Sequence, residues 1–292
     1  MLRNPLLFGI FLFLLANIGF ALTDASAKWL MQALGILPFY MIAFRFLTGQ
    51  ISSMVIGAAL AGPRVWQTSS PWLHIVRSAI MASTTLTNFW AVYYLDLTTT
   101  ITIMFSAPFM VTIMAWLFLG EKVGIHRIIA VGMGFVGVLV VINPSNTTFH
   151  WAMFISIGTA FAIAALSIIT RYGTTQDTLG TQAFYTTLVG AVICSPFLFV
   201  LDSPLPPSIW EWFIFVSVGA IFGTGGHFLN VAAHRFAPAA VLAPIIYTQI
   251  IWMALAQYLI DGRLPGWNTL FGALIIISSG LYLWYRSRLN QA

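Results

Sequence analysis

Apolar residues along this chain fall into long runs, and each run is long enough to form a membrane-spanning helix. At about 1.5 Å per residue, a helix of about 20 residues crosses a hydrocarbon core of about 30 Å. Pro, Gly and Asn residues break the sequence between the runs. Length and breakers together predict ten helical segments, at about 6–30, 36–59, 72–95, 98–119, 125–142, 151–171, 179–201, 210–234, 239–259 and 267–285.

The pattern is clearest in the stretch from Thr98 to Val141. Two apolar segments are joined there by the charged turn Gly120-Glu121-Lys122-Val123-Gly124, and Pro108 interrupts the first of them. A weaker copy of this stretch runs from Pro238 to Tyr285, about 140 residues later, with Pro244 in its first segment. The two stretches indicate that one membrane-embedded unit occurs twice.

Shorter matches extend the repeat over the whole chain. Ala43-Phe44 recurs as Ala183-Phe184 at an offset of 140, and Asn88 recurs as Asn230 at an offset of 142. Each copy contains five segments, an odd number, so the second copy enters the membrane from the opposite side. We therefore expect an all-α membrane protein of ten transmembrane helices, built from two inverted-topology repeats at residues 1–146 and 147–292.

Composition supports a membrane protein and excludes several other classes. Of the 292 residues, 60% are hydrophobic and only 7% are charged, with a mean hydropathy of +0.93; a soluble domain carries about 25% charged residues. Cys194 is the single cysteine, which excludes an internal disulfide and a cysteine-based metal site. We expect no cofactor, no metal and no nucleic-acid partner. The apolar run near Arg3, followed by Ala25-Ser26-Ala27, imitates a signal peptide, and we interpret it as a retained first helix.

The basic residues predict the orientation of the helices. Counted on alternate sides of the ten segments, only Lys28 and Arg263 lie on one side, while Arg45 lies within a segment. Basic residues gather on the cytoplasmic side of membrane proteins, so both termini should be cytoplasmic. The nine basic residues on the other side are Arg3, Arg64, Arg77, Lys122, Arg127, Arg171, Arg235, Arg286 and Arg288.

These motifs allow a comparison with known families. Pro108, the turn Leu119-Gly120-Glu121-Lys122, the following Gly132 and Gly137, and Arg45 in the second segment resemble the drug/metabolite transporter superfamily in its ten-helix form with two EamA-type repeats. Within that superfamily the chain is most similar to the bacterial amino-acid exporters, especially those that handle aromatic amino acids. The resemblance implies export of small metabolites across the inner membrane.

Asp24 is the one acidic residue inside a predicted segment. A carboxylate at the bilayer centre costs about 2.5–3.5 kcal/mol on insertion scales, so this residue needs a partner. Lys28 lies one turn further on the same segment, and Arg45 lies at a similar depth in the next segment. The group Asp24, Lys28 and Arg45 is either a structural ion pair near the outer surface or a site for coupling or for a substrate amine.

Polar and aromatic side chains at helical spacing indicate a water-filled cavity between the two copies. They occur on segments that the repeat pairs with one another, at similar depths. Each of them has hydrogen bonding between helices as an alternative role. The predicted substrate-binding set is Asn17, Thr84, Asn88, Trp90, Thr159, His227, Asn230, Tyr247, Gln249 and Trp252.

Pro108 and Pro244 lie in the middle of corresponding segments, at an offset of 136. A proline in a helix removes one backbone hydrogen bond and leaves a carbonyl without its donor. In hydrocarbon that carbonyl needs a partner or a cavity. We predict that both prolines are hinges, with a simple kink as the alternative.

The sequence thus predicts an inner-membrane secondary transporter that exports small metabolites, most specifically neutral or aromatic amino acids, by alternating access. With one buried acid, the chain has little machinery for proton antiport, which favours facilitated transport. Efflux of drugs or quaternary cations is the alternative within transport, and an intramembrane enzyme or a structural protein is a remote one. The expected partners are the substrate and membrane lipid, with the chain as a monomer or a weak homodimer.

Overall fold

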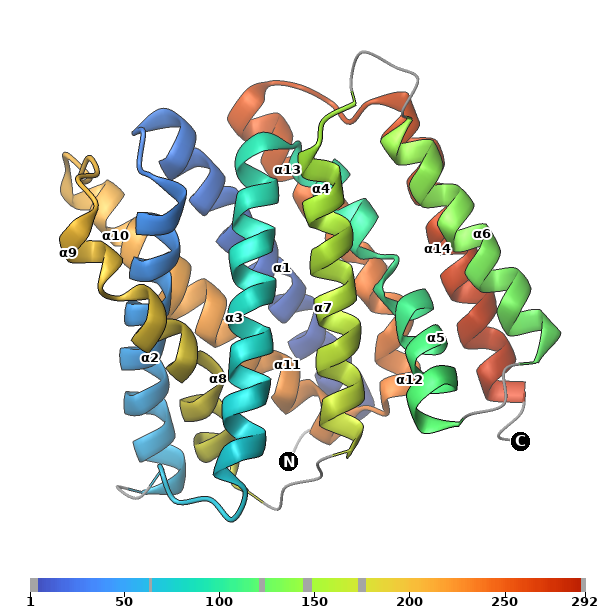
Figure 1. Cartoon of the computed structure of the whole chain (residues 1–292), viewed down its shortest axis with the longest axis horizontal. Helices are drawn as coiled ribbons and strands as arrows, with labels where there is room; N and C mark the ends of the chain where they lie inside the picture. Colours follow the sequence, from blue (N-terminus) through green and yellow to red (C-terminus); the bar gives the residue numbers. More distant parts are fainter. Residues whose placement is uncertain (1–4, 63–64, 121–123, 144–148, 173–176, 290–292) are drawn as a thin grey trace.

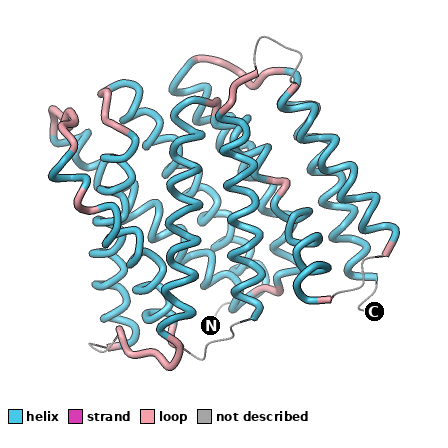
Figure 2. The backbone as a smooth tube through the Cα atoms, in the orientation of Figure 1, coloured by secondary structure: helices cyan, strands magenta, loops and turns pink. Residues whose placement is uncertain are grey.

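The computed structural model describes residues 5–62, 65–120, 124–143, 149–172 and 177–289. Within these residues every regular element is a helix, which confirms the all-α class (Figure 2). The first half contains α1 (Pro5–Ala33), α2 (Pro38–Ala61), α3 (Pro71–Tyr94), α4 (Leu97–Met104), α5 (Ala107–Leu119) and α6 (Ile125–Ile142). The second half contains α7 (Ala152–Tyr172), α8 (Leu179–Cys194), α9 (Phe197–Val200), α10 (Ile209–Ser217), η1 (Val218–Gly223), α11 (Thr224–Phe236), α12 (Ala239–Leu242), η2 (Ala243–Thr248), α13 (Gln249–Asp261) and α14 (Trp267–Leu289).

Eight helical stretches among the described residues are long and apolar enough to cross a membrane, and Ile128–Ile142 in α6 is a shorter apolar helix. Large apolar side chains cover their outer faces, for example Phe199 at 91% exposure. An exposed apolar surface of this extent fits lipid rather than water as the solvent. α3 is not among the eight stretches, although it is 24 residues long, because polar residues interrupt its apolar surface.

The predicted segment at 98–119 is a helix broken in two. α4 ends at Met104, and α5 restarts at Ala107 with Pro108 in its first turn. Across the break, the Ser106 N–H donates to the carbonyl of Ile103 at 3.0 Å, a tighter turn than an α-helix makes. α5 then ends at Gly120 in the left-handed conformation, with φ of +63°.

The corresponding stretch of the second half is also broken, but by a different geometry. α12 is followed by a 3-10 segment, η2, which contains Pro244, and only then by α13. α13 ends at Gly262, again in the left-handed conformation with φ of +66°. Gly120 and Gly262 therefore end corresponding helices in the same way.

Two other predicted segments contain irregular turns that hydrophobic periodicity did not indicate. The segment at 179–201 is interrupted at Ser195 and Pro196, between α8 and α9. The segment at 210–234 contains the π-helical turn η1 between α10 and α11. Such a turn holds an additional residue and is frequent at functional sites.

The helices pack in pairs that recur between the halves. α1 packs against α11 and α13, while α7 packs against α3 and α5. α2 packs along α8, and α6 packs along α14 (Figure 1). α6 and α14 approach closely because Gly137 and Gly272 lie at their crossing; a Cβ on Gly137 would lie 3.1 Å from the carbonyl oxygen of Gly272.

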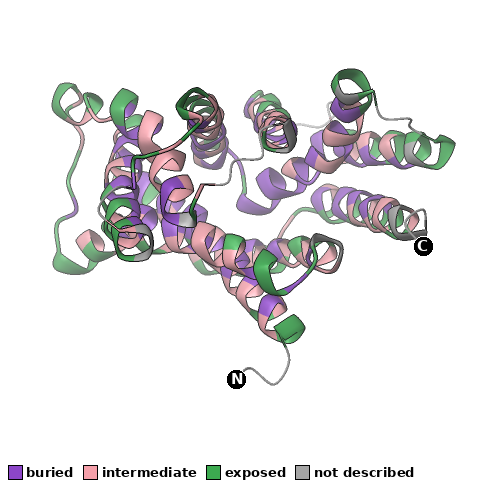
Figure 3. Cartoon of the chain, turned by 90° about the horizontal axis from the view of Figure 1, so that it is seen from below, coloured by how far each residue is buried: buried purple, intermediate pink, exposed green. Residues whose placement is uncertain are grey.

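We name the two ends of the bundle by their place in Figure 1. At the lower end α1 begins, α2 ends, α3 and α8 begin, and α14 ends; the opposite end is the upper end. Figure 3, seen from below, shows buried residues on the sides of helices that face one another and exposed residues on the outer sides. Some predicted features lie outside the described residues: Glu121 and Lys122 of the charged turn, together with Arg3 and Arg64.

Candidate functional site

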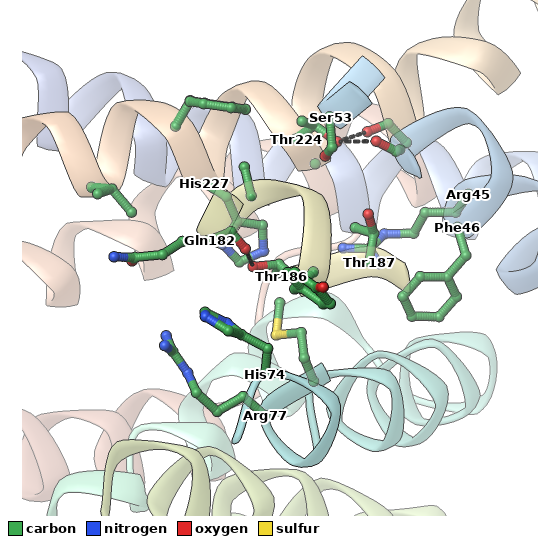
Figure 4. Close-up of a pocket in the computed structure, with 18 of the residues that line it drawn as sticks. Arg45, Phe46, Ser53, His74, Arg77, Gln182, Thr186, Thr187, Thr224 and His227 are labelled. Atoms are coloured by element: carbon green, nitrogen blue, oxygen red, sulfur yellow. Dashed lines mark hydrogen bonds between the residues drawn. The ribbon is translucent and has the colours of Figure 1, made fainter. Parts of the chain in front are cut away.

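A cavity of about 180 Å³ lies in the lower half of the bundle, between α2, α3, α8 and the η1–α11 helix. Small-molecule sites commonly measure about 300–1,000 Å³, so the cavity in this conformation is a compact one. Its walls come from both halves of the chain (Figure 4). Val231 of α11, which also lines the cavity, is 42% exposed.

Basic and hydrogen-bonding side chains line this cavity. Arg45 of α2 lies at one end and His227 of α11 lies near its middle, while His74 and Arg77 enter from α3 (Figure 4). Three residues of α8, Gln182, Thr186 and Thr187, add amide and hydroxyl groups.

The guanidinium of Arg45 is held by one hydrogen bond and two aromatic rings. Its Nη1 donates to the Thr85 hydroxyl at 3.1 Å. Its central carbon lies 5.5 Å from the ring centroid of Phe46 and 5.2 Å from that of Phe89, within the range of cation–π contact. Its Nε is buried and has no hydrogen-bond partner. The cation also interacts electrostatically with Asp24 and with His227.

Below the cavity, a lower-end network of Thr68, His74, Asp177 and Tyr185 ties the two halves together. Asp177 accepts hydrogen bonds from the Thr68 hydroxyl at 2.6 Å and from His74 Nε2 at 2.7 Å. The His74 ring stacks on the Tyr185 ring at 4.9 Å, and the Tyr185 hydroxyl donates to the carbonyl of Trp66 at 2.8 Å. Since His74 and Tyr185 also line the cavity, the network forms its lower wall.

Asp177 lies between α7 and α8, outside the spanning helices. Partial burial raises the pKa of its carboxyl, but hydrogen bonds from Thr68 and His74 lower it by more. The net pKa therefore lies below the usual value of an aspartate, and the charged form is favoured.

A second set of polar contacts, the upper-end network of Lys28, Leu95, Thr98, Gln257 and Asp261, closes the opposite end. Lys28 is only 3% exposed; its Nζ donates to the carbonyl of Leu95 at 2.8 Å and lies 3.8 Å from the Asp261 carboxylate. Gln257 Oε1 accepts from both the backbone N–H and the hydroxyl of Thr98, at 3.2 and 2.8 Å. These bonds join α1, the start of α4 and the end of α13.

The structure therefore separates Lys28 from the other two charged residues that the sequence grouped, Asp24 and Arg45. Within the described residues, Lys28 pairs with Asp261 rather than with Asp24. Asp24 instead accepts a hydrogen bond from Asn88 Nδ2 at 2.9 Å and faces the charge of Arg45. Because α1 rises toward the upper end, a long side chain at position 28 reaches Leu95 and Asp261, which are distant in sequence.

Four of the predicted substrate-binding residues lie around the broken helix η2–α13. Asn17 is buried, and its Nδ2 lies 3.4 Å from the carbonyl of Ile245. Tyr247 packs edge-to-face on Phe105 at 5.0 Å. Gln249 is buried at the start of α13, and the buried Trp252 Nε1 has no hydrogen-bond partner.

The other predicted residues are distributed along α3, α7 and α11. Thr159 is buried and donates to the Thr87 hydroxyl at 2.8 Å, which joins α7 to α3. Thr84 donates to a carbonyl of its own helix, and Trp90 packs edge-to-face on the ring of Phe39 near the upper end of α3. The backbone carbonyl of Asn230 pairs with His234 on α11. Of the predicted substrate-binding set, only His227 lines the cavity, together with Arg45 from the predicted charged group.

The sequence analysis missed the part of the cavity that α3 and α8 form. His74 and Arg77 are three residues apart, and Gln182 and Thr186 are four apart, so each pair lies on one helix face. Arg77 lies more than one turn inside the predicted segment 72–95, and this position could have marked it as a candidate site residue. The sequence analysis used Arg77 only to predict the orientation of the helices. No group of three or more His, Cys, Asp or Glu side chains that could hold a metal ion occurs in the described part of the chain.

Comparison with known proteins assigns the fold to a family. Residues 7–143 and residues 150–285 each match the EamA-like transporter family. The chain belongs to this family. It is therefore a multi-pass membrane transporter of the drug/metabolite transporter superfamily.

Two kinds of curated relatives span nearly the whole chain. An S-adenosylmethionine uptake transporter of Rickettsia bellii is 28% identical over 283 residues, covering 96% of this chain and 94% of the relative. A riboflavin transporter of Brucella anthropi is 25% identical over 271 residues, covering 90% and 94%. A solved crystal structure with 17% identity superposes with a TM-score of 0.63 over 99% of both chains, which supports the fold alone.

Proposed function

We propose that this protein is a secondary transporter that moves a small amino-acid-type metabolite across the bacterial cytoplasmic membrane by alternating access. The observation that carries the proposal is the cavity in the lower half, which is lined by Arg45, Arg77 and hydrogen-bonding side chains and enclosed by helices of both halves. The upper-end network closes the path above it. A binding cavity between two repeats, with contacts between the halves at either end, is the arrangement from which alternating access can work.

We propose ten spans, with the lower end and both termini in the cytoplasm. Each half contains five helical rods. In the first half they are α1, α2, α3, α4–α5 and α6, and in the second half they are α7, α8–α9, α10–α11, α12–α13 and α14. Arg77, Arg235 and Arg286 belong to the lower ends of their helices, while Lys28 and Arg263 belong to the upper end, a bias typical of a cytoplasmic lower end. Two family matches and the recurring helix pairs support repeats at residues 1–146 and 147–292.

The proposed substrate class contains an α-amino carboxylate. Neutral and aromatic amino acids belong to it, and so does S-adenosylmethionine, for whose uptake the Rickettsia bellii relative is named. The cavity offers the guanidinium of Arg45 for an anionic group and the rings of Phe46, Tyr185 and Phe228 for an apolar one. One chain supplies all of these groups, so we propose the monomer as the transport unit.

We propose facilitated transport, in which the substrate gradient sets the direction. A carrier with no coupled ion runs in either direction, which accommodates both the export that the sequence predicts and the uptake activity of the relatives. Pro108 and Pro244 remain the proposed hinges, because both lie where helices break between the two ends. Asn17 and Gln249 remain proposed substrate contacts, in the state in which the upper end opens.

Efflux of drugs or quaternary cations is the rival proposal. Arg45 and Arg77 both line the cavity, and a cation that enters it meets two positive charges. The cavity chemistry therefore favours a substrate with an anionic group.

A counterflow assay in proteoliposomes tests this function. Vesicles loaded with an excess of unlabelled solute are diluted into labelled L-phenylalanine, L-leucine, S-adenosylmethionine, riboflavin or tetraphenylphosphonium. We expect accumulation of at least one α-amino carboxylate, with no change when a pH gradient is imposed. Accumulation of tetraphenylphosphonium alone would support the cation rival, and collapse of transport without a pH gradient would refute the facilitated mechanism.

A further inference from the structure

Arg45 is a cation inside a membrane protein, and no carboxylate of the described residues forms an ion pair with it. Among the residues that the structure describes, no Asp or Glu oxygen lies within 4.0 Å of its guanidinium. The nearest opposite charge is Asp24, whose carboxylate is hydrogen-bonded to Asn88 rather than to Arg45. An arginine at membrane depth costs about 2.5–3.5 kcal/mol or more, so an unpaired one at a cavity indicates a functional role.

Most of the hydrogen-bonding capacity of Arg45 is unused by protein. A guanidinium has five N–H donors, and the structure assigns one of them, on Nη1, to Thr85. The Nε is buried without a partner. The rings of Phe46 and Phe89 contact the guanidinium without accepting a conventional hydrogen bond, so they position it without satisfying its remaining N–H donors.

Glycines lie beside those donors. A Cβ on Gly223 of η1 would lie 3.6 Å from Nη2 and 3.7 Å from Nε of Arg45, the distances of van der Waals contact. Gly223, Gly219 and Gly49 all line the cavity next to Arg45. The π-helical turn thus presents backbone rather than side chains to the edge of the guanidinium that has no partner.

From these contacts we propose that Arg45 binds the carboxylate of the transported substrate through Nε and Nη2. A planar fork of two donors matches the two oxygens of a carboxylate. The inference rests on the proposed function, since it names the group that recognises the substrate class. It assigns the substrate carboxylate to a charged donor on α2, apart from the proposed contacts Asn17 and Gln249.

Arg77 provides the matched control. It also lines the cavity and carries the same charge, but it enters from α3 near His74, away from Arg45 (Figure 4). Replacement of either residue by Gln changes the net charge of the cavity equally. A general field effect weakens binding alike in both variants, whereas a specific carboxylate site is lost only in Arg45→Gln.

The binding experiment uses two pairs of probes that differ in the carboxylate alone. They are L-phenylalanine with L-phenylalaninamide, and S-adenosylmethionine with decarboxylated S-adenosylmethionine, titrated into purified protein by calorimetry. We expect the wild type and Arg77→Gln to prefer the carboxylate probe, and Arg45→Gln to bind it about 10- to 100-fold more weakly. Retention of the carboxylate preference in Arg45→Gln, or an equal loss in Arg77→Gln, overturns the proposal.

A second experiment needs no variant and no knowledge of the true substrate. Phenylglyoxal modifies exposed guanidinium groups, and peptide mass spectrometry follows Arg45 and Arg77 separately in the wild type. We expect sodium benzoate, but not benzamide, to slow modification of Arg45 several-fold while leaving Arg77 unchanged. Equal rates at Arg45 with and without benzoate overturn the proposal even if transport is found.

Absence of counterflow for every probe refutes the proposed function, while the protection assay still decides for or against Arg45.

Discussion

Two cations of the first half, Lys28 and Arg45, lie inside the bundle in opposite chemical situations. Lys28 has a carbonyl at 2.8 Å and a carboxylate at 3.8 Å, from two other parts of the chain. Arg45 has one hydroxyl, two rings and a free Nε beside a cavity. A buried charge whose partners come from the protein holds helices together, whereas one with unused donors is available to a ligand.

Among the substitutions that test this contrast, removal of the Lys28 side chain should have the largest effect, on the opening of the upper end. Lys28→Met leaves the Leu95 carbonyl without its donor and removes the bond between α1 and α13, so the upper end should open more often. Charged hydrogen bonds contribute about 1.5–3 kcal/mol, which corresponds to a shift of about 10- to 150-fold in the equilibrium. In a Cys194→Ser background, the rate at which an impermeant maleimide modifies Ala91→Cys, a buried position on α3, should rise accordingly.

Gln32→Met is the control for that measurement. Gln32 is exposed at the same end of α1 and donates to the carbonyl of Tyr93 at 3.2 Å. Because water replaces that bond readily, the maleimide rate should stay near the wild-type value. An equal rise of the maleimide rate in both variants would contradict this prediction. It would show that exposed and buried polar contacts contribute alike to keeping the upper end closed.

The backbone contact beside Arg45 should have the next largest effect. A Cβ on Gly219 would overlap the Thr48 hydroxyl and the carbonyl of Arg45, both on α2. Gly219→Ala should therefore lower the free energy of unfolding by about 1–3 kcal/mol. Gly225→Ala on the same rod meets nothing within 4 Å and should be neutral or gain up to about 1 kcal/mol. Thermal unfolding in detergent measures both, and equal melting temperatures would show that α2 and η1 pack less tightly than described.

The lower-end network should give the smallest effect, as a pH dependence of stability. The pKa of Asp177 is lower in the folded protein than the about 3.9 of an unfolded aspartate, so the charged form stabilises the fold. This contribution is present above about pH 4 and is lost as the pH falls through the lower folded value. The melting temperature should fall less between pH 6 and pH 3 in Asp177→Asn than in the wild type, and parallel curves would contradict the role of Asp177.

The positions of the helices were predictable because, in a membrane protein, the length of each apolar run and the residues that interrupt the sequence between runs largely determine where a helix begins and ends. The start of α2 at Pro38 and the end of α5 at Gly120 follow from the conformational limits of these two residue types. The π-helical turn at Val218–Gly223 was not predictable from the local sequence, and the close contact that Gly219 makes with α2 depends on tertiary packing.

The candidate site was predictable only in part, for a related reason. Helical spacing identified Arg45 and His227 as polar residues at membrane depth, and both line the cavity. Spacing also suggested that Lys28 pairs with Asp24 one turn away, but its partners are Leu95 and Asp261, which only the tertiary fold brings near. Contacts between segments far apart in sequence require the packing of α1 against α13, which a single sequence does not record.

The π-helical turn has a consequence for how this protein tolerates a change in chain length. Its closing hydrogen bond runs from the Thr224 N–H to the carbonyl of Gly219, five residues back, so the turn holds one residue more than an α-helix needs. Deletion of Ala220 should convert it to ordinary helix and keep α10 and α11 in register, whereas a deletion within the regular α13 rotates every later residue by about 100°. Deletion of one residue should therefore be accepted in this turn and rejected within α13.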